Sequence, residues 1–599
     1  MTQQETKNNR DNRELRVIRV LEIDLTNSRL EIHERTDLAH YLGGTGLAAK
    51  LFSEFLKKDL DPLAEEQPII FANGPLATIF PVATKVISVF RSPLTGEYGE
   101  SHAGMRLGLA MRGARYDAIV IHGKAKRPTY LTVNAEAVNF KDASAIWGMG
   151  VGEVGTILRK LVPGTGHRSS LRIGQAGERK VAFANVNVDT YRHFGRLGLG
   201  AVFGAKNLKA MVVVGNTNEP LTNAKEYKQA YEDIYNQTVK TDIMDKYHGL
   251  GTAINVIPLN ELNALPTKNM QESNFEHAEA ISGEAFAEQT LLRQIACSGC
   301  PIGCIHIGLH RQMFGELYEY ESKSISYDHE LIFALGSYLG MSSQDKVYKL
   351  IDKVEDLGLD AITAGVALGW VIEAFEKGII DETLLGTEVA FDEVEGCLHV
   401  LENIVKQPNE FYRLLAKGTD AVAEVYGGLD FAMTMGKTEM AGYHTGHAHV
   451  IGQSIGARHS HLDNAGYSVD QKHRKDQGKP ETHKKMIREL IDEECWRNVL
   501  TSVGVCLFAR NIYTPERVIK ALAATGCKVN EQQLNELGKD IYKLKHRLRT
   551  DLGFNIDELR FPKRFFETKS LIGQLSEETI QSMLDEYKQQ LSNLLSNVQ

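Results

Sequence analysis

The 599-residue sequence has few cysteines, no long hydrophobic run and no excess of positive charge. Its seven cysteines are an odd number at low density, which excludes the disulfide framework of a small secreted protein. Its 77 acidic residues outnumber its 68 basic ones, and the formal net charge of −9 argues against a nucleic-acid-binding protein with a basic face. The hydrophobic content of 43% is that of a globular chain. Since the seven thiols do not form a disulfide framework, their purpose is the open question.

Signals for export or membrane insertion are also missing. The first residues, MTQQETKNNRDNRELR, contain no apolar segment, so neither a signal peptide nor an anchor is expected there. The apolar run AITAGVALGWVI at 361–372 is shorter than the roughly 20 residues that a membrane span needs. We therefore expect a buried helix at 361–372 and a cytoplasmic protein without a membrane span.

The sequence pattern changes from strand-like to helical about one third of the way along the chain. VIRVLEIDL and RLEIHER flank Thr26-Asn27-Ser28 and predict a hairpin, and further β-branched runs follow as PIIFANG, TKVISVF, DAIVIHG, TYLTVN, KVAFANVNV and AMVVVG. After about Glu219, apolar residues recur with helical spacing, with a softer break near residue 433. The prediction is an α+β multidomain fold, with a β-rich domain at 1–217 and two mainly α-helical domains at 218–433 and 434–599.

The most informative string is Cys297-Ser-Gly-Cys300-Pro-Ile-Gly-Cys304, which follows EAFAEQTLLRQIA, a stretch that we expect to be helical. Thiolates at i, i+3 and i+7 of a turning loop can bind three corners of one iron–sulfur cluster, and the remote Cys506 could be the fourth ligand. Zinc is the competing metal, although structural zinc sites more often use paired C-x₂-C units or added histidines. Buried free thiols are the alternative without a metal. Three further cysteines are expected to fill core space: Cys397, Cys495 and Cys527.

Two glycine-rich strings differ in what they predict. Gly150-Val-Gly152-Glu-Val-Gly155 fits G-x-G-x-x-G, but no strand is predicted before it, so we do not expect a dinucleotide site. The string from Tyr191 to Gly200 offers arginines and backbone N–H groups that suit a phosphate-bearing ligand. Its alternative interpretation is a glycine-rich turn with surface arginines.

In their order along the chain, these strings resemble the aldehyde:ferredoxin oxidoreductases, which are tungsten- or molybdenum-pterin enzymes with one [4Fe-4S] cluster. The matching strings are GGTGLAAKLF, GPLATIF, FRSPLTGEYGE, DAIVIHGKAKRPTYL, FGRLGLGAVFGAKNLKA, CSGCPIGC, DLGLDAITAG, GVCLF and RFPKRFF. The resemblance implies a β-domain that forms the base for two pterins, with two helical domains closing over them. It also implies that the pterins hold the metal, so that no side chain ligates it.

The resemblance assigns the cofactor-binding residues by position. The cluster ligands are Cys297, Cys300, Cys304 and Cys506. The family's pterin motif, D-x-x-G-L-D/C, occurs twice, with Glu355 and Thr501 in place of the leading Asp. A carboxylate accepts two hydrogen bonds from the N–H edge of a pterin, whereas Thr501 offers one hydroxyl, so we expect its contact to be weaker, rearranged or water-mediated. Without the resemblance, both copies predict helix C-caps. The implied pterin-contacting residues are Lys85, His102, Arg192, His193, Gly195, Arg196, Glu355, Gly358, Leu359, Asp360, His461, Thr501, Gly504 and Val505.

Several of these positions depart from the family pattern. Lys85 stands where an Arg between the cluster and a pterin is usual, and it keeps the charge but loses the fork of donors. His102 stands where an Asn near a magnesium ion is usual. Arg192 to Arg196 correspond to the site of the pterin phosphates, which Mg²⁺ bridges in the family. Lys349 occupies the place of a Glu that binds an inter-subunit iron in some members, so we expect any oligomer to lack that iron.

The resemblance also implies the residues of the proton chemistry. Glu330 in YDHELIFALG corresponds to the active-site Glu, and His459 in GARHSHLDNAGY to the active-site His. A carboxylate can accept a proton from water, while an imidazole can hydrogen-bond the carbonyl oxygen as charge develops. Nearby acidic alternatives to Glu330 are Glu319, Glu321 and Asp328.

The predicted activity is oxidation of an aldehyde to a carboxylic acid, with electrons passing through the cluster to ferredoxin or a separate iron–sulfur subunit. Three alternatives stay open at this point: a benzoyl-CoA-type aromatic-ring reductase on the same scaffold, a non-catalytic electron-transfer subunit, and a zinc-stabilised binding protein. The sequence does not distinguish tungsten from molybdenum, because no side chain is expected to bind the metal.

Overall fold

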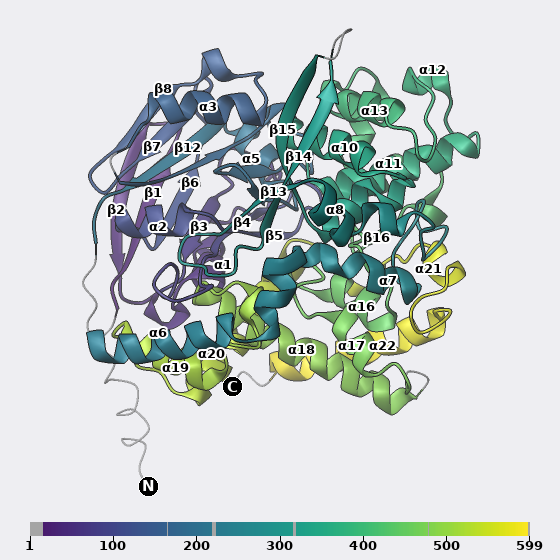
Figure 1. Ribbon diagram of the computed structural model, residues 1–599. Helices are drawn as coiled ribbons and strands as arrows, with labels where there is room; N and C mark the ends of the chain where they lie inside the picture. Colours follow the sequence, from purple (N-terminus) through teal and green to yellow (C-terminus); the bar gives the residue numbers. More distant parts are fainter. Residues whose placement is uncertain (1–15, 165, 219–222, 315–318, 477–478, 597–599) are drawn as a thin grey trace.

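The computed structural model describes residues 16–164, 166–218, 223–314, 319–476 and 479–596. Figure 1 shows two β-sheets built from the first third of the chain on one side and helices from the remainder beside and below them. The fold class predicted from the sequence, an N-terminal β-rich part followed by mainly helical ones, is confirmed. The expectation for the first sixteen residues falls almost wholly on residues 1–15, which lie outside the described part of the chain.

The N-terminal sheets contain six strands each. The first has the order β2-β1-β6-β3-β4-β5, and the second has the order β11-β10-β9-β12-β7-β8. The strands are β1 Ile18–Asp24, β2 Arg29–Arg35, β3 Ile69–Asn73, β4 Val86–Arg91, β5 Tyr98–Ala103, β6 Ala118–His122, β7 Thr129–Val133, β8 Val138–Asp142, β9 His167–Arg172, β10 Val186–Val188, β11 Arg192–Phe194 and β12 Leu208–Gly215. The predicted hairpin is confirmed, since β1 and β2 pair antiparallel from Ile18 opposite Arg35 to Asp24 opposite Arg29.

One hydrophobic core joins the two sheets. Phe71 on β3 lies 5.4 Å, ring centre to ring centre, from Phe194 on β11, and Leu171 and Met211 of the second sheet belong to the same buried cluster. The helices of this part are α1 Gly44–Phe55, α2 Leu107–Gly113, α3 Val151–Leu161, α4 Gln175–Glu178 and α5 Leu199–Ala205. Helix α3 begins directly after Gly150 and follows a short 3₁₀ turn rather than a strand, as expected for a string that is not a dinucleotide fingerprint.

The remainder of the chain is mainly helical. Its helices are α6 Ala224–Val239, α7 Val256–Glu261, α8 Gly283–Gln289, α9 His329–Leu335, α10 Gln344–Leu357, α11 Ala361–Glu376, α12 Glu382–Leu385, α13 Glu395–Lys406, α14 Glu410–Leu415, α15 Thr419–Tyr426, α16 His447–Ile455, α17 Gly466–Lys472, α18 Pro480–Ser502, α19 Pro515–Ala524, α20 Glu531–Asp551, α21 Arg564–Glu567 and α22 Glu577–Ser596. Helix α11 is the buried helix predicted at 361–372. The domain boundaries at 217/218 and 433/434 stay predictions.

Two small sheets interrupt the helices. Strands β13 Leu291–Ile295, β14 Ile305–Met313 and β15 Tyr320–Tyr327 form an antiparallel sheet, and β16 Thr434–Met435 pairs with β17 Thr438–Glu439 near the softer break. The predicted helix over EAFAEQTLLRQIA is therefore only half right. Helix α8 ends at Gln289, and the following residues pair with β14 instead, because pairing partners override a helical pattern this short.

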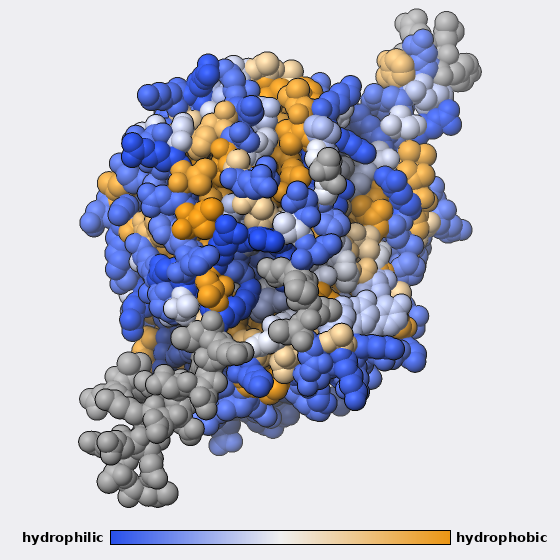
Figure 2. All heavy atoms as spheres, turned by 90° about the vertical axis from the view of Figure 1, so that its left-hand side faces the viewer, coloured by the Kyte–Doolittle hydropathy of each residue, from blue (hydrophilic) through white to orange (hydrophobic). Residues whose placement is uncertain are grey.

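Among the described residues, no helix has the length and hydrophobicity needed to cross a bilayer. Figure 2 shows the face on the left of Figure 1, where hydrophobic residues form separate patches between hydrophilic ones. Helix α20, from late in the chain, packs against α1 and β5, so a C-terminal segment returns to the first sheet.

Candidate functional site

The three clustered cysteines lie in the loop that joins β13 to β14. Gly299 and Gly303 have positive φ angles of 77° and 68°, which let the loop turn sharply at each of them. The fourth, Cys506, comes from far along the chain, just after α18. Its backbone N–H donates to the carbonyl of Val82 at 2.9 Å, which fixes it beside the N-terminal part.

The electrostatics of these thiols indicate that all four are neighbours. The pKa of Cys304 is raised to about 11, mainly by burial; Arg192 acts to lower it, and the thiols of Cys506 and Cys297 act to raise it. Burial likewise raises the pKa of Cys300, with the other three thiols adding to the effect. A cationic Arg192 at this place offsets the negative charge that four thiolates would bring.

The described ranges contain no compact ligand set for a single metal ion, since no three or more His, Cys, Asp or Glu side chains are grouped so that they could hold one. In an iron–sulfur cluster, each thiolate binds its own iron atom. A Cβ added at Gly104, the residue that follows β5, would meet Cys297 Sγ at 2.6 Å, so the backbone after β5 lies close to this thiol.

The two pterin-motif copies have the same local geometry. Gly358 ends α10 with φ of 77°, and Gly504 follows the end of α18 with φ of 89°, which is left-handed backbone that glycine adopts without strain. The next residue of each copy forms a single antiparallel bridge to the N-terminal part, Leu359 to Ala184 and Val505 to Ala83. Both helix ends therefore contact the N-terminal part in the same way. The helix C-caps predicted from the residues and the two copies of the family motif are the same turns.

The two leading residues of the motifs have different contacts. Glu355 Oε2 lies 2.8 Å from His193 Nε2, which brings the first motif to β11. The hydroxyl of Thr501 instead donates to the carbonyl of Arg497 at 2.8 Å within its own helix. Asp360 caps α11 by accepting from the N–H of Ile362 at 3.1 Å.

The glycine-rich string after β10 lies against the first motif. Arg196 Nε is 3.4 Å from Asp360 Oδ2, and its Nη2 donates to the carbonyl of Glu439 at 2.7 Å. Its Nη1 is buried and has no hydrogen-bond partner among the described residues. A Cβ added to Gly195 would meet open space. A buried donor beside an open backbone position is what an anionic ligand requires.

Lys85 lies near the thiol loop, whereas His102 lies on β5 and contacts Glu100. The N–H of Lys85 donates to the carbonyl of Gly504 at 3.0 Å, and its Nζ lies 3.6 Å from the Cβ position of Gly104. His102 Nε2 contacts Glu100 Oε1 at 2.6 Å, and burial followed by the nearby Arg458 lowers the pKa of His102 to about 3. Its ring is therefore neutral at neutral pH.

Glu330 is a partly exposed acidic candidate that lies beside His461. It lies in the first turn of α9, where Oε2 accepts from the N–H of Gly442 at 3.0 Å and Oε1 is 3.4 Å from His461 Nε2. Burial raises the pKa of Glu330 to about 8. The alternatives differ: Glu319 is exposed, Glu321 contacts Gln312, and Asp328 caps α9.

His459 and His461 have separate surroundings. His459 Nε2 is 3.0 Å from Glu97 Oε2 and 3.3 Å from Arg549 Nη2, so its side chain belongs to a buried ionic network. Its φ of 53° is left-handed backbone, which is uncommon for a residue other than glycine. His461, predicted as a pterin contact, is the histidine beside Glu330.

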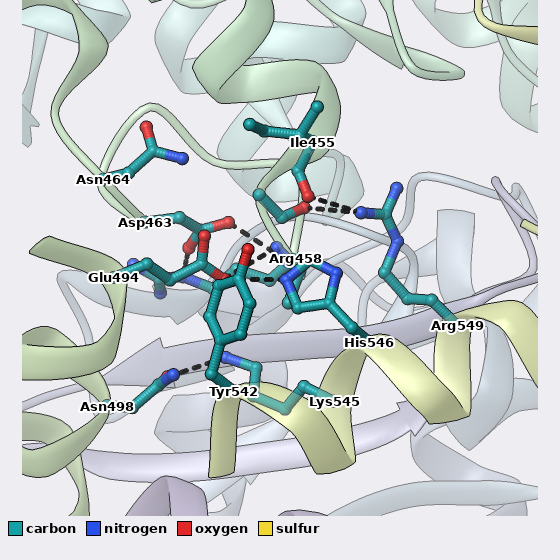
Figure 3. A network of polar contacts seen from close by, with 12 residues as sticks. Ile455, Arg458, Asp463, Asn464, Glu494, Asn498, Tyr542, Lys545, His546 and Arg549 are labelled. Atoms are coloured by element: carbon teal, nitrogen blue, oxygen red, sulfur yellow. Dashed lines mark hydrogen bonds and ion pairs between the residues drawn. The ribbon is translucent and has the colours of Figure 1, made fainter. Parts of the chain in front are cut away.

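The network around His459 joins α18, α20 and the loop after α16. Figure 3 shows Arg549 donating to the carbonyl of Ile455, at 2.7 Å, and the ion pair of Arg458 with Asp463. In the same network Lys545 bridges Asn498, at 3.1 Å, to Glu100 on β5. All these side chains are buried, so the network fixes the loop that carries both histidines.

Sequence reasoning missed an aromatic cluster beside Glu330. The rings of Tyr443 and Tyr467 stack at 4.9 Å, and Tyr443 also lies 5.3 Å from His461 and 5.8 Å from His449. The string YHTGHAH at 443–449 is rich in histidine and was the available signal in the sequence.

Lys349, which stands where some family members have an iron-binding Glu, pairs with Asp345 at 3.0 Å along α10.

Comparisons with known proteins agree with one another. Residues 20–215 match the family model "Aldehyde ferredoxin oxidoreductase, N-terminal domain", and residues 227–590 match "Aldehyde ferredoxin oxidoreductase, domains 2 & 3". The chain is 31% identical to a tungsten-containing aldehyde ferredoxin oxidoreductase of Pyrococcus furiosus, over 92% of this chain and 91% of that protein.

One further relative and one solved structure with the same fold are also similar to this chain. An aliphatic sulfonate oxidoreductase, WOR-like subunit, of the same organism is 30% identical over 67% of this chain and 66% of its own. The active site complex BamBC of benzoyl coenzyme A reductase, solved with 1,5 dienoyl-CoA, contains a chain with the same fold, with a TM-score of 0.78 at 20% identity over 96% of this chain and 94% of that one.

Proposed function

The chain belongs to the aldehyde ferredoxin oxidoreductase family, and we propose that it oxidises aldehydes to carboxylic acids at a tungsten (or molybdenum) bis-pterin centre. Electrons would leave through a [4Fe-4S] cluster to ferredoxin or to an iron–sulfur partner subunit. The observation that carries this proposal is the pair of glycine turns at Gly358 and Gly504, which end two helices and meet the N-terminal sheets in the same way.

The residues around these turns fit a phosphate-bearing cofactor. The unpartnered Nη1 of Arg196 and the open space at Gly195 supply a donor and room for an anion, with Mg²⁺ as the proposed counter-ion. When bound, the group would supply a two-electron acceptor, which no side chain provides. The residues proposed to hold it are Lys85, His102, Arg192, His193, Gly195, Arg196, Glu355, Gly358, Leu359, Asp360, His461, Thr501, Gly504 and Val505.

Glu330 is the proposed proton acceptor of the reaction. A carboxyl group whose pKa is about 8 exchanges protons near neutral pH, as a general acid–base catalyst requires. Its Oε2 is oriented by the N–H of Gly442, which leaves Oε1 for water and for His461.

Two histidines, His459 and His461, are candidates for the second catalytic residue. His459 was predicted to hydrogen-bond the carbonyl oxygen, but its Nε2 lies against Glu97 and Arg549. We therefore propose that His461 acts beside Glu330, while His459 holds the loop that carries His461. Burial lowers the pKa of His461, so its neutral ring can donate from one nitrogen and accept on the other.

The four thiols fit the proposed cluster because they come from one tight loop and one anchored residue. Arg192 and Lys85, which both lower the pKa of Cys304, favour the thiolate form that iron binding needs. We also propose that the protein is cytoplasmic, that its partner is ferredoxin or an iron–sulfur subunit, and that any oligomer lacks the inter-subunit iron.

The test is elemental analysis of anaerobically purified protein, followed by turnover of a panel of aldehydes with a viologen acceptor. We expect about four iron atoms per chain together with tungsten or molybdenum, and aldehyde-dependent viologen reduction. Iron without tungsten or molybdenum would favour an electron-transfer subunit. Turnover of benzoyl-CoA but not benzaldehyde would favour the ring reductase, and zinc without iron would favour a binding protein.

A further inference from the structure

Arg196 is held at two of its three guanidinium nitrogens by residues of the helical part. Its Nε lies 3.4 Å from Asp360 Oδ2, and its Nη2 donates to the backbone carbonyl of Glu439 at 2.7 Å. Its Nη1 is buried and has no hydrogen-bond partner within the described part of the chain. A guanidinium group is planar and rigid, so contacts that fix Nε and Nη2 also fix the direction of Nη1. The residues that hold this plane therefore determine where Arg196 can bind an anion.

Glu439 is itself fixed by two helices. It ends the short hairpin β16–β17 and is 1% exposed. Its carbonyl also accepts from Gln453 Nε2 on α16, at 3.0 Å. Its Oε1 accepts from the backbone N–H and the hydroxyl of Thr419, at 3.1 Å and 2.9 Å. Thr419 is the first residue of α15, and this N–H has no partner inside its helix, so Glu439 also caps α15.

The other carboxyl oxygen of Glu439 is linked to Asp360 through one hydroxyl. Thr363 Oγ1 lies 3.1 Å from Glu439 Oε2 and 2.6 Å from Asp360 Oδ2. A threonine hydroxyl has one proton to donate, so it cannot donate to two ionised carboxylates at once. Asp360 also accepts from the N–H of Ile362 and faces Arg196, and both contacts suit a carboxylate.

The extra proton therefore belongs to Glu439. Its neutral carboxyl can donate from Oε2 to Thr363, while Thr363 donates to Asp360. Burial raises the pKa of Glu439, against the opposing effects of the Thr419 N–H and Arg196. The result is a one-way series of hydrogen bonds that ends at the carboxylate beside Arg196.

We propose that Glu439, through its uncharged carboxyl, is a positioning residue that holds Arg196 so that Nη1 is directed at a phosphate of the bound pterin. The side chain of Glu439 acts through Thr363 and Asp360 on Nε, and its backbone carbonyl binds Nη2 directly. A neutral Glu439 also adds no negative charge next to an arginine that must bind an anion. The inference rests on the proposed function.

The experiment compares wild type, Glu439→Gln and Glu439→Ala. The amide of Gln can donate to Thr363 and its oxygen can accept from Thr419, as the neutral carboxyl does, whereas Ala makes neither contact. The readout is tungsten or molybdenum, and pterin, per iron atom in anaerobically purified protein, which does not depend on turnover. We expect Gln to keep the wild-type ratio and Ala to lower it about tenfold, the effect of one charge-assisted hydrogen bond.

The matched control is Glu373→Ala. Glu373 lies on α11, the helix that carries Thr363, and it is also 1% exposed. Its carboxylate contacts Asn269 Nδ2 at 2.7 Å and Arg564 Nη2 at 2.6 Å. Its loss should lower the unfolding temperature without changing the metal and pterin content per iron. An equal loss of metal and pterin in Glu373→Ala and Glu439→Ala would overturn the inference, because any destabilisation would then release the cofactor.

Other outcomes separate the inference from the proposed function. A full ratio in Glu439→Ala overturns the inference, and so does a Glu439→Gln that loses as much as Ala, because a charge would then be required. Thr363→Val keeps the size of the side chain but breaks the link to Asp360, so it should also lower the ratio, and an unchanged ratio contradicts the link. Wild type that holds neither pterin nor tungsten or molybdenum refutes the proposed function instead.

Infrared spectroscopy tests the protonation of Glu439 without any cofactor. The difference spectrum between wild type and Glu439→Gln should contain the carbonyl stretch of a protonated carboxylic acid, present only in wild type. A difference spectrum with carboxylate bands in its place overturns the inference.

Discussion

Replacement of Glu330 by Gln tests the proposed role of Glu330 as proton acceptor and distinguishes that role from a purely structural one. Glutamine keeps the size of the side chain and can still accept from the N–H of Gly442, but it cannot take a proton from water. Loss of a general base typically costs 10²- to 10⁴-fold in rate, so we expect kcat to fall by about that factor with metal content unchanged. In wild type, kcat/KM should rise with pH through about 8, the pKa of Glu330, because only the ionised carboxylate is a base.

The same substitution should stabilise the protein. The folded-state pKa of Glu330, about 8, lies above the ordinary value of 4.5, so the protonated form is favoured on folding. Stability from this group is fully present below pH 4.5 and is lost as pH rises toward 8. At pH 7 the ionisable carboxyl then costs about 3 kcal/mol, which Gln removes.

The assay is denaturant unfolding of Glu330→Gln and wild type at pH 5 and pH 7, with Glu321→Gln as the control. We expect a stability gain that is larger at pH 7 than at pH 5, together with lost turnover. An active Glu330→Gln refutes the catalytic role, and an equal or smaller gain at pH 7 refutes the raised pKa.

Three further substitutions test other parts of the site. Arg549→Met should destabilise the fold by about 3–5 kcal/mol in denaturant unfolding, because it removes the buried guanidinium that pairs with the buried Glu97; a loss below about 1 kcal/mol would contradict this. Gly504→Ala should lower both stability and tungsten or molybdenum content, since its φ is 89° and the new Cβ would lie 2.9 Å from Ala77 Cβ; unchanged metal content would count against the docking role. Cys506→Ser should lower iron content and abolish the reduced-cluster EPR signal, and a full iron complement would remove Cys506 from the ligand set.

The sequence predicted the parts of this site that are encoded locally. The spacing of Cys297, Cys300 and Cys304 predicts a thiol loop by itself, and the structure places those residues in one turn between two strands. Cys506 was assigned as the fourth ligand from the family resemblance, because it lies about two hundred residues beyond the other three cysteines and no local spacing points to it. Its position depends on a backbone hydrogen bond to Val82.

Other features depend on packing that a pattern does not contain. His459 and His461 lie two residues apart, yet one ring contacts Glu97 and the other Glu330. The stretch before the thiol loop has helical spacing, yet Leu291–Ile295 became a strand because β14 was available to pair with it.

The central claim is that one chain couples aldehyde oxidation to its own cluster. The most direct measurement is EPR spectroscopy of anaerobically purified, oxidised protein after addition of aldehyde without any external acceptor. The account predicts that aldehyde alone produces the signal of the reduced [4Fe-4S] cluster in wild type and not in Glu330→Gln. A cluster that dithionite reduces but no aldehyde does would contradict it.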